Sequence, residues 1–272
     1  MGEWQFLDPA SRGNLMEAWE RESEGMFELA ADPDRWEAPT GAGHWEVRDV
    51  IGHLVDTTET YFIGFDTARG EGEGPENLGL RDMALNVNKG AQAFRDTPQS
   101  ELLARLKDDR DQMMGIAADL TDDEWSEMLV PHKYMGPLPA PFYPLFQVVD
   151  YGVHSWDIRE GTGMAHALDA DTADILVPLA FILWQSTPDA PTETEPYTIG
   201  VEVTSGRNAG KHRVSLSPEG LTVEEGELDD LPAVIEFDPA TIVLTSYGRM
   251  NAGTIRGDRE VADRFLNSFF RI

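Results

Sequence analysis

Two histidines and one aspartate stand inside helix-like stretches of the sequence, at spacings that suit metal binding. His53 lies within VRDVIGHLVD, and His154 lies within VVDYGVHSWDI. Asp150 precedes His154 by four positions, so both side chains leave one face of a helix a turn apart. Such a pair can clamp a metal ion, and an imidazole from a facing helix, as the third ligand, would leave open positions for water or substrate. The spacing alone leaves a second interpretation open, in which Asp150 and His154 are a surface or capping pair.

Composition limits the chemistry that the rest of the chain can add. The 272 residues include no cysteine, which excludes disulfides, protein thiolate nucleophiles and cysteine-ligated zinc, so any thiol must arrive as a separate molecule. With 21 basic and 50 acidic side chains the net charge is −29, which argues against nucleic acid or an anionic membrane as a partner. The amino terminus lacks a basic region followed by an apolar run, and the longest apolar stretch, 175–184, is too short to span a bilayer. We therefore expect a cytoplasmic protein with small-molecule partners.

Helices must position the candidate residues, because apolar residues recur with a helical period through the first two thirds of the chain. Thr97 is expected to cap one helix, with Pro98 in its first turn. The stretch from Val130 to Pro144 holds five prolines and is predicted to be irregular. The expected helices are 15–30, 47–65, 80–94, 98–120, 144–158 and 169–184, the last bent at Pro178.

The pattern changes after Pro191 to alternation with period two, which is typical of strands. Strands are expected at 197–204, 212–216, 221–224 and 233–237, followed by a helix at 241–247, an extended segment at 254–256 and a last helix after Asp258. Helices followed by strands predict an all-α bundle and then a small α+β domain. The predicted division is 1–168 for the bundle, 169–192 for a connecting helix and linker, and 193–272 for the α+β domain.

Three segments resemble a known family. They are similar to the mycothiol-dependent maleylpyruvate isomerase family, part of the DinB-like group of metal-binding four-helix bundles. The first segment contains RWEAPT and GHWEVRDVIGHL, the second is DYGVHSWDIREGTG and the third is LTSYGRMNAGTIRGD. The resemblance covers nearly the whole chain in order. It implies a DinB-like four-helix bundle followed by a small sterol-carrier-like domain.

The resemblance also implies a site and its cofactors. It assigns one divalent metal, usually zinc, to His53, Asp150 and His154, with Asp150 standing where relatives often carry glutamate. The implied co-substrate is mycothiol, which as a metal-bound thiolate would attack a small electrophile. Isomerisation and S-transfer both fit this chemistry, and the sequence does not separate them.

Several roles outside the three ligands stay open. Arg249 is a candidate catalytic residue, as a clamp for an anionic group, or else a surface arginine that packs the small domain. Asp157 would orient a ligand histidine or pair locally, and the loop 132–143 is apolar enough to form a wall of a substrate pocket. The alternatives for the whole chain are a non-catalytic small-molecule or lipid-binding protein, a zinc-dependent hydrolase of a thiol conjugate, and an interaction module. The substrate and the oligomeric state are not determined by the sequence.

Overall fold

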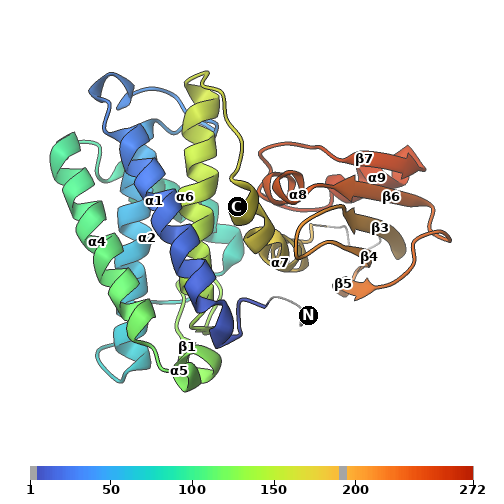
Figure 1. The fold of residues 1–272 in the computed structure, drawn as a ribbon, viewed down its shortest axis with the longest axis horizontal. Coiled ribbons are helices and arrows are strands. Elements are labelled where there is room, and N and C mark those ends of the chain that lie inside the picture. Colours follow the sequence, from blue (N-terminus) through green and yellow to red (C-terminus); the bar gives the residue numbers. More distant parts are fainter. Residues whose placement is uncertain (1–4, 190–194, 272) are drawn as a thin grey trace. The chain divides into compact units, whose positions relative to one another are not determined.

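The computed structural model describes residues 5–189 and 195–271 and divides after Leu168 into two compact units (Figure 1). We call residues 5–168 the helical unit and the remainder the α+β unit. This arrangement confirms the predicted fold class, a helical bundle followed by a small α+β domain. The limits of the 169–192 connecting helix and linker stay a prediction, and its residues 190–192 lie outside the described residues.

Four long helices make up most of the helical unit. Helix α1 packs against α6, and α2 packs against α3, α4 and α6. Their facing sides bury large apolar side chains, among them Trp19, Leu54 and Tyr151. The elements are α1 (Arg12–Ala30), α2 (Val47–Ala68), α3 (Met83–Gln92), α4 (Gln99–Asp119), α5 (Asp122–Glu127) and α6 (Phe142–Gly161), with short strands β1 (Leu129–Val130) and β2 (Leu138–Pro139).

The amino terminus of α2 is fixed by a reciprocal capping arrangement one turn before His53. Glu46 and Asp49 form a capping box, in which the Glu46 N–H donates to the Asp49 carboxylate at 2.9 Å. The guanidinium of Arg95 donates to both oxygens of the fully buried Asp49, at 2.7 and 2.6 Å. Burial alone would raise the pKa of Asp49, but the hydrogen bonds from Arg95 and Glu46 outweigh it and lower that pKa.

A close approach to α2 brings α3 beside the residue that precedes His53. A Cβ built on Gly52 would lie 2.4 Å from the carbonyl oxygen of Ala91, so only glycine allows the two backbones to come this near. The glycine therefore sets the distance between α3 and the face of α2 that carries His53.

One local prediction was wrong, and one helix was not predicted. Helix α4 begins at Gln99 with Pro98 itself at the capping position and no side-chain cap, so Thr97 does not cap it. The stretch after α4 forms a further helix, α5, whose capping box joins Thr121 and Glu124. The cause is local chemistry: the Thr121 hydroxyl accepts from the Glu124 N–H, and the Glu124 carboxylate accepts in return, which starts a new helix.

In its described residues, 169–189 and 195–271, the α+β unit consists of one five-stranded sheet and three helices. The strand order is β5-β4-β3-β6-β7, with β3 and β6 parallel and the other neighbours antiparallel. Trp184 of α7 lies in the core of this unit, with its ring 5.2 Å from that of Phe265. The elements are α7 (Ala170–Ser186), β3 (Tyr197–Val203), β4 (Gly210–Ser217), β5 (Gly220–Glu225), β6 (Ala233–Phe237), α8 (Pro239–Ser246), β7 (Thr254–Gly257) and α9 (Arg259–Leu266).

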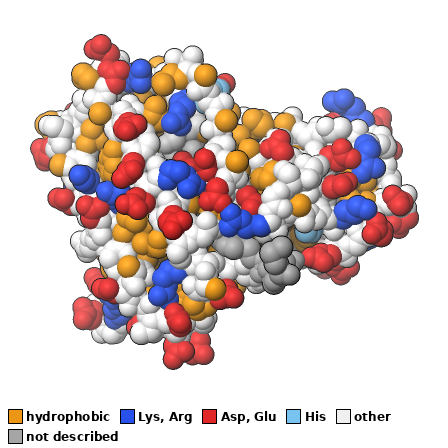
Figure 2. Space-filling model, in the orientation of Figure 1, with side chains coloured by type: hydrophobic (Ala, Val, Ile, Leu, Met, Phe, Trp, Pro, Cys, Tyr) orange, Lys and Arg blue, Asp and Glu red, His pale blue; other side chains and the backbone are white. Residues whose placement is uncertain are grey.

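The surface carries the acidic excess of the sequence. Figure 2 shows Asp and Glu side chains spread over this face, with Lys and Arg between them and no single basic patch. A net charge of −29 disfavours association with a polyanion such as nucleic acid. Among the described residues, no helix is both long enough and apolar enough to cross a membrane.

Candidate metal centre

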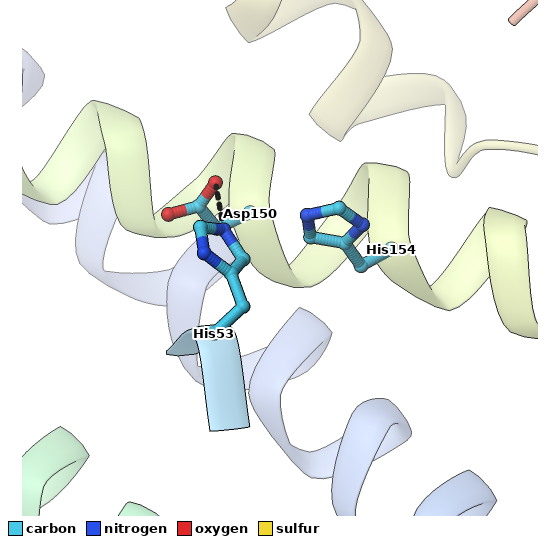
Figure 3. A group of neighbouring side chains, drawn as sticks. All are labelled: His53, Asp150 and His154. Carbon is cyan, nitrogen blue, oxygen red and sulfur yellow. Dashed lines mark ion pairs between the residues drawn. The ribbon is translucent and has the colours of Figure 1, made fainter. Parts of the chain in front are cut away.

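Helices α2 and α6 bring His53, Asp150 and His154 together (Figure 3). One possible ligand atom from each of the three residues lies within 4.8 Å of the other two. Nε2 of His53 is 3.8 Å from Oδ1 of Asp150, and the two imidazole rings meet edge to face with centroids 5.1 Å apart. Asp150 and His154 come from consecutive turns of α6, whereas His53 reaches them from α2. The side chains of both histidines are about nine-tenths buried.

A buried carboxylate orients His154. Oδ2 of Asp157 lies 2.8 Å from Nδ1 of His154, three residues earlier on α6, and the Asp157 side chain is fully buried. An ionised carboxylate only accepts hydrogen bonds, so Nδ1 carries the proton and Nε2 is the nitrogen through which His154 would bind a metal. The sequence left two roles open for Asp157, orienting a ligand histidine or pairing locally. The contact with Nδ1 of His154 supports the first role.

The loop before α2 holds Asp157 in place from the other side. The N–H of Gly41 donates to the Asp157 carbonyl oxygen at 2.7 Å. A Cβ on Gly41 would lie 3.2 Å from Oδ1 of Asp157, so a larger residue would press on the carboxylate that orients His154.

A neutral group occupies the corresponding position at His53. The hydroxyl of Thr57, one turn later on α2, lies 3.2 Å from Nδ1 of His53. This contact again directs Nε2 toward Asp150, but without the full negative charge that Asp157 supplies to His154. The hydrogen bond between Thr57 and His53 is therefore expected to be weaker than that between Asp157 and His154.

The indole of Trp45 packs against both histidines. Its ring centroid is 5.1 Å from that of His53 and 5.7 Å from that of His154. The indole N–H donates to Oδ1 of Asn88 on α3 at 3.0 Å, and Nε2 of His44 lies 2.9 Å from the same oxygen. Trp45 had no predicted role, although its place just before α2 in the GHWEVRD segment is a usable signal.

The donor set fits a divalent transition metal. Two imidazole nitrogens and one carboxylate oxygen are the ligands that zinc and non-haem iron take in three-ligand sites with open positions. Both Nδ1 atoms already have second partners, which is the usual arrangement of histidines that bind metal through Nε2. The role of these three residues as ligands stays a prediction.

Arg249 lies in the α+β unit, after the end of α8. Its N–H donates to the Leu244 carbonyl oxygen at 2.8 Å, and its guanidinium donates to the Tyr247 carbonyl oxygen at 3.0 Å. The side chain is partly exposed. Its role as an anion clamp stays a prediction.

A known protein family matches the part of the chain that contains the candidate metal centre. The family described as the mycothiol maleylpyruvate isomerase N-terminal domain matches residues 16–159, which include all three residues of the candidate site. No curated protein sequence gives a significant match.

The fold is similar to that of a solved enzyme. The crystal structure of the mycothiol-dependent maleylpyruvate isomerase superposes with a TM-score of 0.57 and 12% sequence identity, covering 90% of this chain and 92% of that one. A mutant of that isomerase with a histidine replaced by alanine gives the same values. At this identity the likeness concerns the fold, and the family match covers more than half of the sequence. The chain belongs to the mycothiol maleylpyruvate isomerase N-terminal domain family.

Proposed function

We propose that this protein is a metal-dependent enzyme that uses an external low-molecular-weight thiol, mycothiol, for isomerisation of a small electrophile or for S-transfer to it. The observation that carries the proposal is the convergence of His53, Asp150 and His154, with each imidazole oriented through its Nδ1. The family match over residues 16–159 supports the choice of thiol.

The charge of the donor set suits the binding of a thiolate. Two neutral imidazoles and one carboxylate contribute a single negative charge, so a divalent metal held by them, zinc being our expectation, would keep a net positive charge and lower the pKa of a coordinated thiol. His53 and His154 must stay neutral to act as ligands; the Asp157 carboxylate would hold the proton of His154 at Nδ1, and the Thr57 hydroxyl can accept one from Nδ1 of His53. Because the chain has no cysteine, no protein thiol competes with the external one.

Metal analysis is the first test. Protein purified without a histidine tag should contain about one divalent metal per chain, and the His53→Ala/His154→Ala double variant should contain none. His166→Ala is a matched control, because His166 interacts with Glu160 and Met164 rather than with the three candidate ligands. A wild-type protein that stays metal-free after reconstitution with zinc, iron and manganese would contradict the proposal.

Thiol dependence separates the remaining alternatives. Incubation with mycothiol and a cis α,β-unsaturated carbonyl compound, followed by NMR, should give either the trans isomer with thiol unchanged or a stable thioether. The first product identifies an isomerase and the second an S-transferase. Hydrolysis of a mycothiol conjugate without added thiol would instead indicate a hydrolase.

A further inference from the structure

A third buried histidine, His132, lies in the loop between β1 and β2, close to the candidate metal centre. Its backbone N–H donates to the Gly136 carbonyl oxygen at 3.0 Å. The hydroxyl of Tyr143, on α6, lies 2.9 Å from the Val130 carbonyl oxygen and 3.0 Å from that of Pro131. These bonds fix the backbone on both sides of His132, so its ring has a defined orientation.

Aromatic rings surround the His132 side chain. Ring centroids of Phe146, Tyr61, Tyr134 and Tyr143 lie 5.6, 5.9, 6.0 and 6.1 Å from that of His132. The residue is only 7% exposed. Such surroundings disfavour the charged imidazolium, and burial lowers the pKa of His132 to about 4, although the charge of Asp150 acts in the opposite direction.

The hydrogen bond at Nδ1 decides where the proton of the neutral ring lies. The N–H of Tyr134 donates to Nδ1 of His132 at 3.1 Å, so this nitrogen is an acceptor and carries no proton. The single proton of the neutral imidazole must then sit on Nε2. Within residues 5–189 and 195–271 Nε2 has no hydrogen-bond partner. His132 therefore offers one unused N–H donor.

The His132 ring contacts residues of both α2 and α6, the helices that carry the candidate metal ligands. Phe146 precedes Asp150 by one turn of α6, a rise of about 6 Å, and Tyr61 follows His53 by two turns of α2. Both aromatic residues contact the His132 ring. A small substrate with one end at the three candidate ligands would thus have its other end near His132.

We propose that His132 is a catalytic residue whose Nε2–H donates to the carbonyl oxygen of an α,β-unsaturated substrate while the thiolate adds to it. This inference rests on the proposed function. In the step, the thiolate sulfur forms a bond to the β-carbon, the electron pair of the double bond moves to join the α-carbon and the carbonyl carbon, and the carbonyl oxygen becomes an enolate. The former double bond is then a single bond and can rotate. Return of the electron pair expels the thiolate and leaves the trans isomer.

A neutral donor suits this step better than a charged one. The hydrogen bond strengthens as negative charge develops on the oxygen, in a site that is largely closed to water. An imidazolium could protonate the enolate on oxygen or the thiolate on sulfur, and either transfer would divert the reaction. The neutral ring keeps its proton and only stabilises the charge.

Two substitutions separate donation from a purely structural role. The amide nitrogen of His132→Gln can replace the Nε2 donor, whereas the amide oxygen of His132→Asn can replace the Nδ1 acceptor for Tyr134. If His132 donates to substrate, His132→Asn loses about 10²–10³-fold in kcat and His132→Gln keeps most of it. A structural role predicts the reverse order, and that result would overturn the proposal. Metal content and melting temperature are measured for both variants, so that loss of the site or of the fold is recognised.

Nitrogen NMR tests the protonation state without any turnover. In metal-free wild-type protein labelled with ¹⁵N at histidine, the His132 signals are assigned by their disappearance in His132→Asn. We expect a neutral ring with the proton on Nε2 at pH 7. A proton on Nδ1, or an imidazolium, would refute the inference even if the enzyme proves to be thiol-dependent. If His132 shows the expected tautomer but the protein takes up no metal in the metal analysis, the Nε2–H donor stands and the proposed function is contradicted instead.

Discussion

Replacing Asp157 by asparagine tests how strongly a buried carboxylate supports metal binding at His154. The change keeps the shape of the side chain but removes the charge that faces Nδ1 at 2.8 Å. Asparagine can also donate its amide to Nδ1, which would place the proton on Nε2 and block that nitrogen as a ligand. Loss of such a partner lowers metal affinity by about 10–100-fold, or about 1.4–2.8 kcal/mol. We expect the upper part of this range because Asp157 is fully buried.

Thr57→Val is the matched variant at the other histidine. It removes a neutral partner from Nδ1 of His53, at 3.2 Å, and replaces it with a side chain of nearly the same volume. Because an ionised acceptor makes the stronger hydrogen bond, Thr57→Val should weaken metal binding less than Asp157→Asn does, by less than about tenfold.

Competition against a chromophoric chelator gives the zinc Kd of wild type and of both variants at one pH. Melting temperatures of the metal-free proteins show whether either substitution disturbs the fold. An Asp157→Asn variant that binds zinc as tightly as wild type would refute the role of Asp157. A larger loss of zinc affinity in Thr57→Val than in Asp157→Asn would do the same, provided that both variants remain folded.

Three further predictions concern the surroundings of the site. Gly52→Ala should destabilise the protein by about 1–3 kcal/mol in urea denaturation, because the new Cβ would meet the Ala91 oxygen at 2.4 Å. Its control is Gly115→Ala on the exposed face of α4, where a Cβ meets nothing within 4 Å; this change should stabilise the protein by about 0.5–1 kcal/mol. Arg95→Met should cost about 2 kcal/mol at neutral pH, less than a fully buried pair because Arg95 is 36% exposed. The pKa of Asp49 is lowered in the folded protein, so this difference should be full above its unfolded pKa of about 4 and vanish as the pH falls through the folded value. Zinc titration should change the tryptophan fluorescence of wild type and have little effect on that of Trp45→Phe, because this indole lies against both histidines; an unchanged signal in wild type would argue against binding at this place.

Local spacing carried much of the information about the candidate site. The four-residue step from Asp150 to His154 places both side chains on one face of α6 in any regular helix. The contacts of Thr57 with His53 and of Asp157 with His154 are also local, at separations of four and three residues. For Asp157 the sequence left two interpretations open, because spacing alone does not show which group its carboxylate meets.

Other features needed contacts between distant segments. Trp45 reaches its partner Asn88 across 43 residues, and His132 lies near Phe146 only because a prolyl loop folds back on α6. The short helix α5 was missed because a single capping box, rather than a long apolar period, starts it.

The sequence by itself determined the helical and α+β halves, the pair on α6 and the absence of any protein thiol, because period, spacing and composition are local properties. Only the tertiary structure decided that His53 faces that pair, that Trp45 covers both imidazoles and that the proton of His132 lies on Nε2. These depend on how close helices approach and on which backbone group meets each ring nitrogen, and both are set by packing between segments far apart in the chain.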